Sequence, residues 1–409
     1  MGERGLLFSA DGVSMFGSLS TGHLIGLSPE EVEWCEAFAQ ERISLREVAA
    51  KHPDLADELE RGELGEVEPS TVCGAYLHVT QRCNLSCIGC YSGGGGRNLI
   101  PDPPLEKLEF VLSYLARLGV STLNISGGEP FLRSDLPEIV KKATESYGIE
   151  VVNVLTNGTV CDTTMLQRLA PFVAAISVSF DGVSASDAAP IRGRQRFDEL
   201  IEFVGLAQEI VGKVCITPTL HRKNIEDMPR YQALANSLGV DLGFSLLSTP
   251  SAGCSTADLL PESPDLVRMV ELLLAPTVGE SSAFSIQSLA GGLVCRNCCG
   301  AGKSTVSVDA DGSVYPCHMM HDARFLMGNV FKETAPAYLE DTCWEVWSLA
   351  AECEECDYRY LCGGGCRART VAAGSDKDPY CAMHQAFYGE VLRRVKRQFE
   401  RRECDAISQ

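Results

Sequence analysis

The stretch RCNLSCIGCYSGGGGR, residues 82–97, places Cys83, Cys87 and Cys90 in the spacing C-x3-C-x2-C. Four glycines follow at 93–96, and no fourth cysteine stands nearby. A structural zinc site usually has four protein ligands, and ordinary electron-transfer clusters use four cysteines. Three thiolates can instead hold three irons of a cubane cluster and leave the fourth iron open to a cofactor or substrate. The triplet therefore favours such a cluster, with a zinc site completed by a distant residue as the alternative.

Around this stretch, from about residue 75 to 275, short β-rich runs alternate with longer helical patterns. The expected strands are AYLHVT (75–80), STLNIS (121–126), EVVNVL (150–155), AAISVSF (174–180), KVCITPT (213–219) and DLGFSL (241–246). Strand–helix alternation predicts a parallel sheet with right-handed crossovers. Six units are too few for a complete eight-fold barrel, so an incomplete (β/α)6 barrel and an open doubly wound sheet both fit.

Unusual residues follow the ends of the expected strands. The cysteine triplet follows the first strand, and Gly127-Gly128-Glu129-Pro130 follows the second. Thr156-Asn157-Gly158 follows the third strand and Asp181-Gly182 the fourth. Active sites of parallel α/β folds lie at the carboxyl ends of the strands, so we expect these residues to converge on one rim.

Cysteines become dense again from about residue 295, and the periodic patterns become short. Cys299, Gly312 and Cys317 fit C-x12-G-x4-C. A second set, C-x2-C-x5-C-x3-C, is followed by one more cysteine, and its members are Cys353, Cys356, Cys362, Cys366 and Cys381. Dense cysteines with only short periodic patterns predict a second domain stabilised by bound metal. A pair of zinc ribbons is the alternative.

Composition narrows the function classes. The chain has 409 residues, 19 cysteines and a formal net charge of −20, which argues against a nucleic-acid binder with a basic surface. No apolar run has the length of a membrane span, and the N-terminus lacks a secretory signal, so we expect a cytoplasmic protein. In a reducing cytosol, clustered cysteines are more often metal ligands than disulfides.

Taken together, the cysteine triplet and the later GGEP resemble the radical S-adenosylmethionine (SAM) superfamily over residues 75–250. The resemblance implies a partial (β/α)6 TIM-like barrel in which Cys83, Cys87 and Cys90 hold a 4Fe–4S cluster whose open iron binds SAM. Reductive cleavage of SAM would then give a 5′-deoxyadenosyl radical that abstracts hydrogen from a substrate. The SAM contacts that the resemblance implies are Gly127, Gly128, Glu129, Asn157, Ser179, Asp181 and Arg192.

One position departs from the family pattern. An aromatic residue that lies against the adenine usually stands directly before the third cysteine. Here that position is Gly89, and Tyr91 stands on the other side of Cys90. We therefore include Tyr91 among the candidate cofactor contacts.

The C-terminal cysteines resemble the SPASM extension of radical SAM enzymes, which carries two auxiliary 4Fe–4S clusters. By that resemblance an outer cluster has the ligands Cys353, Cys356, Cys362 and Cys381. An inner cluster would use Cys299, Cys317 and Cys366, giving three clusters in all with the SAM-binding one. Cys295 is the best candidate for its fourth ligand and Cys298 the next, and an open site is the further alternative.

Residues 1–70 form a separate segment. Short β-rich runs at 6–27 precede two helical patterns, SPEEVEWCEAFAQ (28–40) and SLREVAAKHPDLADELERG (44–62). The arrangement resembles the small winged-helix-like α+β domain with which peptide-modifying enzymes bind a leader peptide as an added strand. An ordinary cap over the barrel fits equally well. The expected domains are 1–70 for recognition, 71–280 for the barrel, 281–390 for the SPASM domain and 391–409 for a C-terminal helix.

Enzymes with a SPASM domain mostly modify peptides or proteins. We therefore expect an oxidoreductase that modifies a ribosomally made precursor peptide by forming a thioether cross-link of the sactipeptide type. The expected partners are that peptide with its leader and an electron donor of the flavodoxin or ferredoxin type, with no nucleic acid and no membrane. Alternatives are maturation of another protein or cofactor precursor by carbon–carbon cross-linking, epimerisation or sulfatase-type chemistry, and a zinc-stapled binding protein. His318 after Cys317 disfavours the sulfatase type, in which Asp is typical there.

Overall fold

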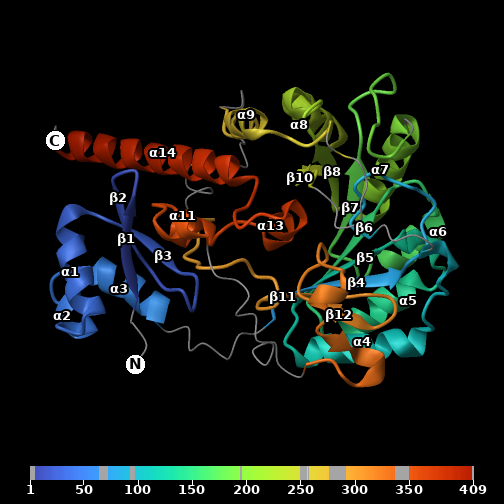
Figure 1. Ribbon diagram of the computed structural model, residues 1–409, viewed down its shortest axis with the longest axis horizontal. Helices are drawn as coiled ribbons and strands as arrows, with labels where there is room; N and C mark the ends of the chain where they lie inside the picture. Colours follow the sequence, from blue (N-terminus) through green and yellow to red (C-terminus); the bar gives the residue numbers. More distant parts are fainter. Residues whose placement is uncertain are drawn as a thin grey trace. The chain divides into compact units, whose positions relative to one another are not determined.

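The computed structural model divides into two compact units, each made of segments that are distant in sequence (Figure 1). The barrel unit comprises residues 70–265 and 300–346, and the terminal unit comprises 1–69, 266–299 and 347–409. The structure describes residues 5–63, 72–92, 97–193, 196–248, 256, 258–275, 292–336 and 350–407. No helix among these residues is long and apolar enough to cross a lipid bilayer.

The barrel unit is built on one sheet with the strand order β10-β8-β7-β6-β5-β4-β11-β12-β13, and β9 pairs with β8. Its parallel strands are β4 (Gly74–Thr80), β5 (Thr122–Gly127), β6 (Val151–Thr156), β7 (Ala175–Phe180), β8 (Val214–Leu220), β9 (Asp241–Leu242), β10 (Ser245–Leu246) and β11 (Thr305–Val308). The antiparallel strands β12 (Ser313–Tyr315) and β13 (Gly328–Asn329) complete it. Consecutive strands are neighbours from β4 to β8, without the reversal of order that a doubly wound sheet has.

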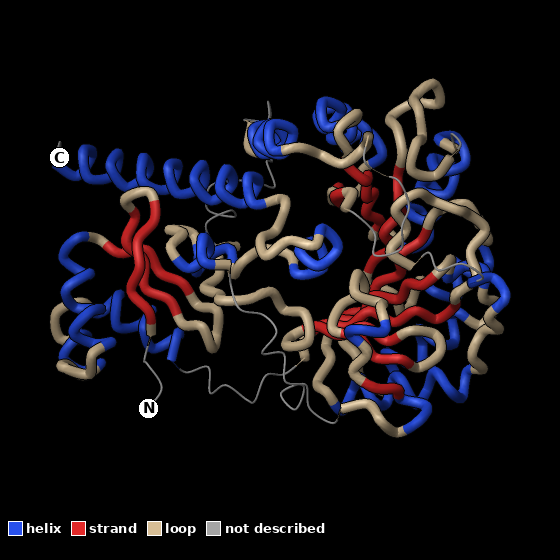
Figure 2. Tube along the Cα trace, in the orientation of Figure 1, coloured by secondary structure: helices blue, strands red, loops and turns tan. Residues whose placement is uncertain are grey.

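Helices cover the outer side of this curved sheet (Figure 2). They are α4 (Leu105–Arg117), α5 (Leu136–Lys141), α6 (Thr163–Leu169), α7 (Phe197–Val211) and α8 (Met228–Leu238), with a π-helical turn at Lys142–Ser146 after α5. Alternate strand residues such as Leu77, Ile125 and Val154 are fully buried against them in one core. The residues between them, such as Asn124 and Asn153, are polar and face the other way. A sheet with one apolar face can carry helices on that face only, so the predicted partial barrel with its small antiparallel N-terminal domain is confirmed.

The sheet continues past β4 through a hairpin that the sequence analysis assigned to the next domain. β11 pairs with β4 in parallel, with Val306 opposite Ala75, and β12 turns back antiparallel to β11. Gly312 makes the turn at φ +82°, where a Cβ would lie 2.6 Å from the Phe331 ring. This turn places Cys317 two residues beyond the end of β12.

The terminal unit begins with an antiparallel sheet in the order β1-β2-β3, made of Leu6–Ala10, Val13–Gly17 and Leu24–Leu27. Helix α1 (Pro29–Ala39) follows, then α2 (Leu45–Ala49) and α3 (Pro53–Glu63). Ser28 and Ser44 cap the first two helices, each in a reciprocal capping box with the glutamate three residues on. The second predicted helix is interrupted before Pro53, because proline lacks the amide that a continuous helix needs.

The C-terminal part of the terminal unit packs on the same sheet. Its helices are α11 (Ala351–Glu354), α12 (Arg359–Cys362), α13 (Arg367–Ala373) and α14 (Cys381–Ile407), and α9 (Ser263–Leu273) shares a buried cluster with α14 through Val270 and Val391. Ala10 and Met15 share a buried cluster with Leu361 and Leu392. The Tyr358 hydroxyl also donates a 2.5 Å hydrogen bond to the Asp11 carboxylate in the β1–β2 turn. The two ends of the chain therefore form one core.

Candidate functional site

The loop with the cysteine triplet follows β4 and is fixed at both ends. The Cys83 amide donates to Oδ1 of Asn98 at 2.8 Å, and the Ile88 amide donates to the carbonyl of Ile191 at 2.8 Å. Cys87 and Ile88 also pack against a small apolar cluster that includes Leu247. These contacts come from segments that follow different strands, so the loop is held at the carboxyl end of the sheet.

The three thiols lie within electrostatic reach of one another. Burial raises the pKa of the Cys87 thiol to about 11; the Arg192 guanidinium opposes this, and the neighbouring Cys90 and Cys83 add to it. Cysteine binds metal as the thiolate. A metal cation that replaced the three thiol protons would offset the repulsion between the three negative charges. The side-chain amide of Asn157 approaches the Cys83 sulfur at 3.8 Å. The donor set fits a metal cluster held by three thiolates.

The segment 127–129 (Gly-Gly-Glu) forms hydrogen bonds with the start of this loop through its main chain. The Gly128 amide donates to the carbonyl of Thr80 and the Glu129 amide to that of Arg82, both at 2.8 Å. A Cβ at Gly128 would lie only 2.0 Å from the Arg82 oxygen, so no other residue type fits there. The close approach that glycine permits is thus made to the cysteine loop itself.

Glu129 is fully buried, and its carboxylate is satisfied by the protein. It accepts hydrogen bonds from the Phe131 amide at 3.0 Å, the Thr156 hydroxyl at 2.7 Å and the Asn157 amide at 2.7 Å. Burial raises the pKa of this carboxyl to about 7, although the three donors oppose the shift. Its side chain therefore ties the end of β5 to the end of β6.

Asp181 and Arg192, both expected as SAM contacts, form an ion pair with each other, and the side chains are 6% and 7% exposed. The Arg192 amide also donates to Oδ2 of Asp181 at 3.2 Å. Arg192 is close enough to Cys87 to oppose the rise in its pKa. His221, which the sequence analysis did not single out, lies near the same carboxylate; burial lowers its pKa and Asp181 opposes that. Ser179 lies two residues before Asp181, in β7.

The departure at Gly89 has a steric cause. Gly89 has φ +71°, and a Cβ there would lie 2.9 Å from Cδ1 of Leu247. Tyr91 is 37% exposed, yet its hydroxyl lies inside, 3.1 Å from the Ser126 hydroxyl on β5. Its ring contacts that of His318 edge to face at 4.9 Å. Tyr91 thus points toward the inner face of the sheet, among residues of β4, β5 and the hairpin.

The four expected ligands of the outer cluster lie close together in the terminal unit. Burial raises the pKa of Cys381; Lys377 opposes the shift, and Cys353 and Cys356 add to it. Cys381 in turn adds to the raised pKa of Cys362, which reaches about 11 mainly through burial. The structure thus brings together four thiols that stand up to 28 residues apart in sequence (381 − 353).

Cys299 and Cys366 belong to the terminal unit and Cys317 to the barrel unit, so their common cluster stays a prediction. The Cys366 amide donates to Asp378 at 2.7 Å, and Asp378 is also paired with Arg369. In the barrel unit, the Cys317 sulfur lies 3.7 Å from Nδ1 of His318.

The two candidates for the fourth ligand have different surroundings. Cys295 is 2% exposed, packs against Gly17 and has a pKa raised to about 11 by burial alone. Cys298 lies against Gly363, directly after Cys362, where a Cβ would be 2.9 Å from the Cys298 nitrogen. Cys295 is thus enclosed against the N-terminal sheet, whereas the main chain of Cys298 lies beside the turn that follows Cys362.

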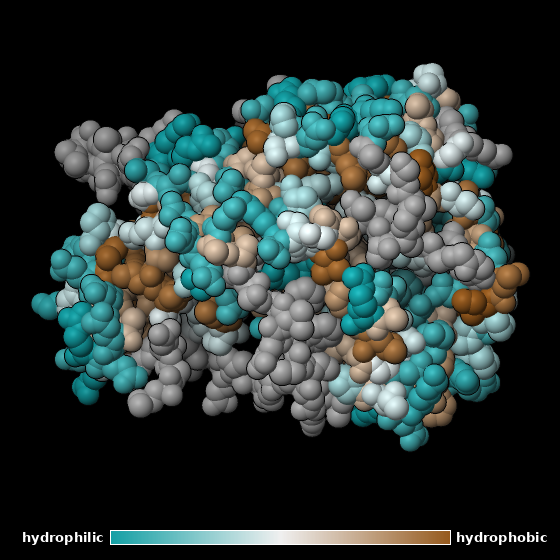
Figure 3. All heavy atoms as spheres, viewed as in Figure 1, coloured by the Kyte–Doolittle hydropathy of each residue, from teal (hydrophilic) through white to brown (hydrophobic). Residues whose placement is uncertain are grey.

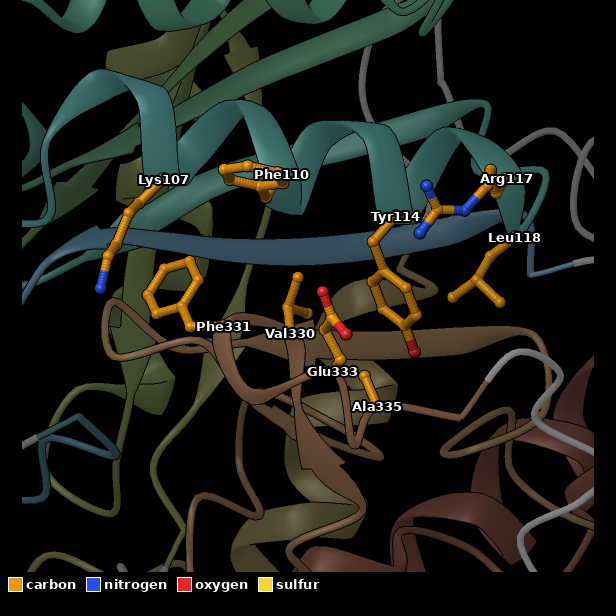
Figure 4. A pocket seen from close by; sticks show the side chains of 9 residues that line it. All are labelled: Lys107, Phe110, Tyr114, Arg117, Leu118, Val330, Phe331, Glu333 and Ala335. Atoms are coloured by element: carbon orange, nitrogen blue, oxygen red, sulfur yellow. The ribbon is translucent and has the colours of Figure 1, made fainter.

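A large cavity of the barrel unit lies elsewhere. Its volume is about 770 Å³, and it lies between the outward face of α4 and the segment after β13 (Figure 4). Phe110, Tyr114 and Phe331 line it together with Lys107 and Glu333. None of the candidate site residues contributes to this lining, so the cavity is separate from the cysteine loop.

Sequence reasoning missed a polar cluster on the inner face of the sheet. His78 and Tyr76 alternate with the apolar residues of β4, and Asp309 directly follows β11. His321 lies beside them, with its ring centroid 4.4 Å from that of His78. The signal was present in the strand AYLHVT, whose histidine stands at a position facing away from the helices.

Comparison with known proteins agrees with this geometry. The family model described as "Radical SAM superfamily" matches residues 77–235, and that of the SPASM "Iron-sulfur cluster-binding domain" matches residues 295–357. Mycofactocin maturase MftC of Mycobacterium tuberculosis is 29% identical over 354 residues, which cover 81% of this chain and 86% of that protein. PqqA peptide cyclase of Granulibacter bethesdensis is 26% identical over 365 residues, with 80% and 90% covered.

Among solved structures, Streptococcus suis SuiB bound to precursor peptide SuiA superposes with a TM-score of 0.59 at 16% identity. The match covers 92% of this chain and 97% of SuiB. At this identity the likeness shows a shared fold.

Proposed function

The chain is an enzyme of the radical SAM superfamily with a SPASM domain, and we propose that it modifies a ribosomally made precursor peptide. The observation that carries the proposal is the terminal unit, where the N-terminal sheet shares a buried core with the segments that carry the outer set of cysteines. The similarity to mycofactocin maturase and PqqA peptide cyclase over four fifths of the chain supports the same substrate class.

The residues of the barrel unit have distinct proposed roles. Cys83, Cys87 and Cys90 would hold a 4Fe–4S cluster with one open iron for SAM. When bound, the cluster and SAM supply a radical, formed by one-electron cleavage of SAM, that can abstract hydrogen. Gly128 and Glu129 fix the cysteine loop through its carbonyls. Asp181 holds Arg192 near Cys87, where the guanidinium can meet the SAM carboxylate.

The leader of the peptide would bind at β3. This strand is at the edge of the three-stranded sheet, and in the described residues it pairs only with β2. Gly26 in its middle faces open space. Hydrophobic side chains gather over the β1–β3 sheet in Figure 3. An edge strand offers unpaired backbone groups, so a leader can add a strand and place its side chains on the apolar surface.

For the bond formed, we propose a thioether between a cysteine sulfur and a carbon of the same peptide. Formation of this bond takes a hydrogen atom from the carbon, which the 5′-deoxyadenosyl radical would accept, and a proton from the thiol; the SPASM clusters would accept the one surplus electron. The inner cluster is proposed to hold the cysteine sulfur, and a protein of the flavodoxin or ferredoxin type is proposed to reduce the SAM-binding cluster.

The test uses the anaerobically reconstituted chain with SAM, a reductant and a short cysteine-containing peptide encoded beside it. We expect 5′-deoxyadenosine and a peptide lighter by two hydrogens per cross-link, with one fewer cysteine open to alkylation. The Cys83→Ala variant should give neither product. Loss of two hydrogens with every cysteine still alkylated would refute the thioether in favour of a carbon–carbon bond. Release of 5′-deoxyadenosine with no change in any such peptide would refute the substrate class.

Leader binding is tested by hydrogen exchange on the full chain. We expect the leader to slow exchange of the Leu24–Leu27 amides and to leave those of Leu6–Ala10 on the opposite edge unchanged. A leaderless core peptide is the control and should protect neither strand. Protection confined to the barrel unit would contradict the proposed docking edge.

A further inference from the structure

Two histidines and one aspartate meet on the inner face of the barrel unit, outside every cysteine set. Nδ1 of His78 lies 3.4 Å from Oδ1 of Asp309, and Nδ1 of His321 lies 3.4 Å from Oδ2 of the same carboxylate. One ligand atom from each residue lies within 4.8 Å of the others. A separation of 3.4 Å is long for a hydrogen bond, whereas two ligands about 2.0–2.1 Å from one tetrahedral ion are about 3.4 Å apart.

The surrounding contacts hold these side chains in position. Nε2 of His321 lies 2.8 Å from the Ser307 hydroxyl, which leaves Nδ1 pointing at Asp309. The carboxylate is fixed by the side-chain amide of Gln81 and by the Ala310 amide at 2.7 Å. An outer hydrogen bond that orients the ring is the usual support of a metal-binding histidine.

The cluster is enclosed by the protein. The side chains of His78, His321 and Asp309 are 0%, 7% and 15% exposed, and in the described residues only the two histidines form ion pairs with Asp309. Although burial opposes ionisation, His321 and His78 hold the pKa of Asp309 below its usual value, while burial lowers that of His321. Both ring nitrogens of His78 are buried without a hydrogen-bond partner. Burial of a carboxylate beside imidazole nitrogens that lack hydrogen-bond partners is costly unless a cation joins them.

We propose that His78, Asp309 and His321 bind one divalent transition-metal ion of the zinc or ferrous class. Two imidazoles with one carboxylate suit these ions, and the three protein ligands leave a position for an oxygen donor. This site is distinct from the iron–sulfur sites and does not depend on the proposed peptide substrate.

The proposed ion site lies near the cysteine loop. The His78 ring lies 6.1 Å from that of Tyr91, the residue after Cys90, and Tyr91 also contacts His318. The ion would therefore lie beside the cysteine loop, on the polar face of the sheet. An oxygen of a substrate, from a carbonyl or a carboxylate, is the ligand class that such a position binds and polarises.

The experiment measures zinc on the full chain after its iron–sulfur clusters have been reconstituted anaerobically. Zinc(II) is added, loosely bound metal is removed with a weak chelator, and zinc is counted by mass spectrometry. We expect about one zinc per chain, lost in Asp309→Asn and in His321→Gln, with X-ray absorption showing nitrogen and oxygen ligands at about 2.0–2.1 Å. His52→Gln, a histidine of the terminal unit, should keep the zinc.

Two results would overturn the proposal. One is a wild-type chain that retains no zinc. The other is zinc with sulfur ligands at about 2.3 Å, which would mean that it occupies cysteine sites. The wild-type spectrum alone decides this point, whether or not a variant folds. Iron content, measured on the same samples, checks that each variant keeps its clusters.

Discussion

At the scale of single residues, Gly89 tests how tightly the cysteine loop is packed. We expect Gly89→Ala to weaken SAM binding and to lower stability by more than the 1–2 kcal/mol that the left-handed conformation alone costs a non-glycine residue. The reason is that the new Cβ would lie 2.9 Å from Leu247. Thermal unfolding and SAM binding by equilibrium dialysis measure the two effects.

Gly148→Ala is the matched control, because Gly148 has φ +68° and nothing within 4 Å of a Cβ. Its stability should fall only by the cost of the left-handed conformation, and it should bind SAM normally. Equal losses in the two variants would mean that contact with Leu247 plays no part.

A second residue-scale prediction concerns the inner auxiliary cluster. Because Cys298 lies against the turn after Cys362 while Cys295 is buried against Gly17, we expect Cys298→Ala to lose iron. Cys295→Ala should keep its iron and lose about 1 kcal/mol of stability or more through the cavity it leaves. Iron analysis and the EPR spectrum of the reduced protein measure the difference. Iron loss in Cys295→Ala alone would reverse the assignment.

At the scale of elements, the capping boxes of α1 and α2 stabilise the N-terminal domain. Ser28→Ala removes the side chain that accepts from the Glu31 amide, and such a change costs about 1 kcal/mol. We expect amides of α1 to exchange roughly five-fold faster with deuterium. Ser20→Ala, in the turn before β3, is the control and should leave α1 unchanged. Unaltered exchange in Ser28→Ala would show that packing alone holds the helix.

The elements also show what the sequence could and could not predict. Strands β4 to β8 lie within one residue of their predicted bounds, because buried parallel strands are marked by apolar runs and by the glycines and polar residues that follow them. The expected strand 241–246 forms two short pieces, β9 and β10. The pairing of β11 with β4 could not be read from the sequence, because it joins residues about 230 positions apart.

The candidate site was predictable to a similar extent. Spacing predicts which cysteines are cluster ligands, since such ligands must stand on loops of defined length, and this assignment stays a prediction. The ion pair of Asp181 and Arg192 and the enclosure of the Glu129 carboxylate depend on which strand ends become neighbours. His78 and Asp309 belong to different predicted domains, so only the fold brings them together.

At the scale of the whole molecule, the cysteine sets are divided between the two units. We expect the double variant Cys353→Ser and Cys356→Ser to lose about four of about twelve irons, since one cubane holds four. It should still release 5′-deoxyadenosine with dithionite and SAM, because the triplet lies in the other unit. Iron analysis and chromatography of the nucleoside measure both. The double variant Cys73→Ala and Cys161→Ala, at exposed thiols, is the control. Loss of all iron would show that the two units take up their clusters together.

The shared core of the two chain ends has a consequence for biosynthesis. Ala10 and Met15 are synthesised before the barrel unit, yet the partners that bury them, Leu361 and Leu392, are synthesised after it. The parallel strands of the barrel unit, β4 to β10, are complete long before then. We therefore expect nascent chains to hold the cysteine loop in place while the apolar face of the N-terminal strands is still uncovered. Premature termination near residue 350 should then leave a folded barrel unit with an aggregation-prone N-terminal segment.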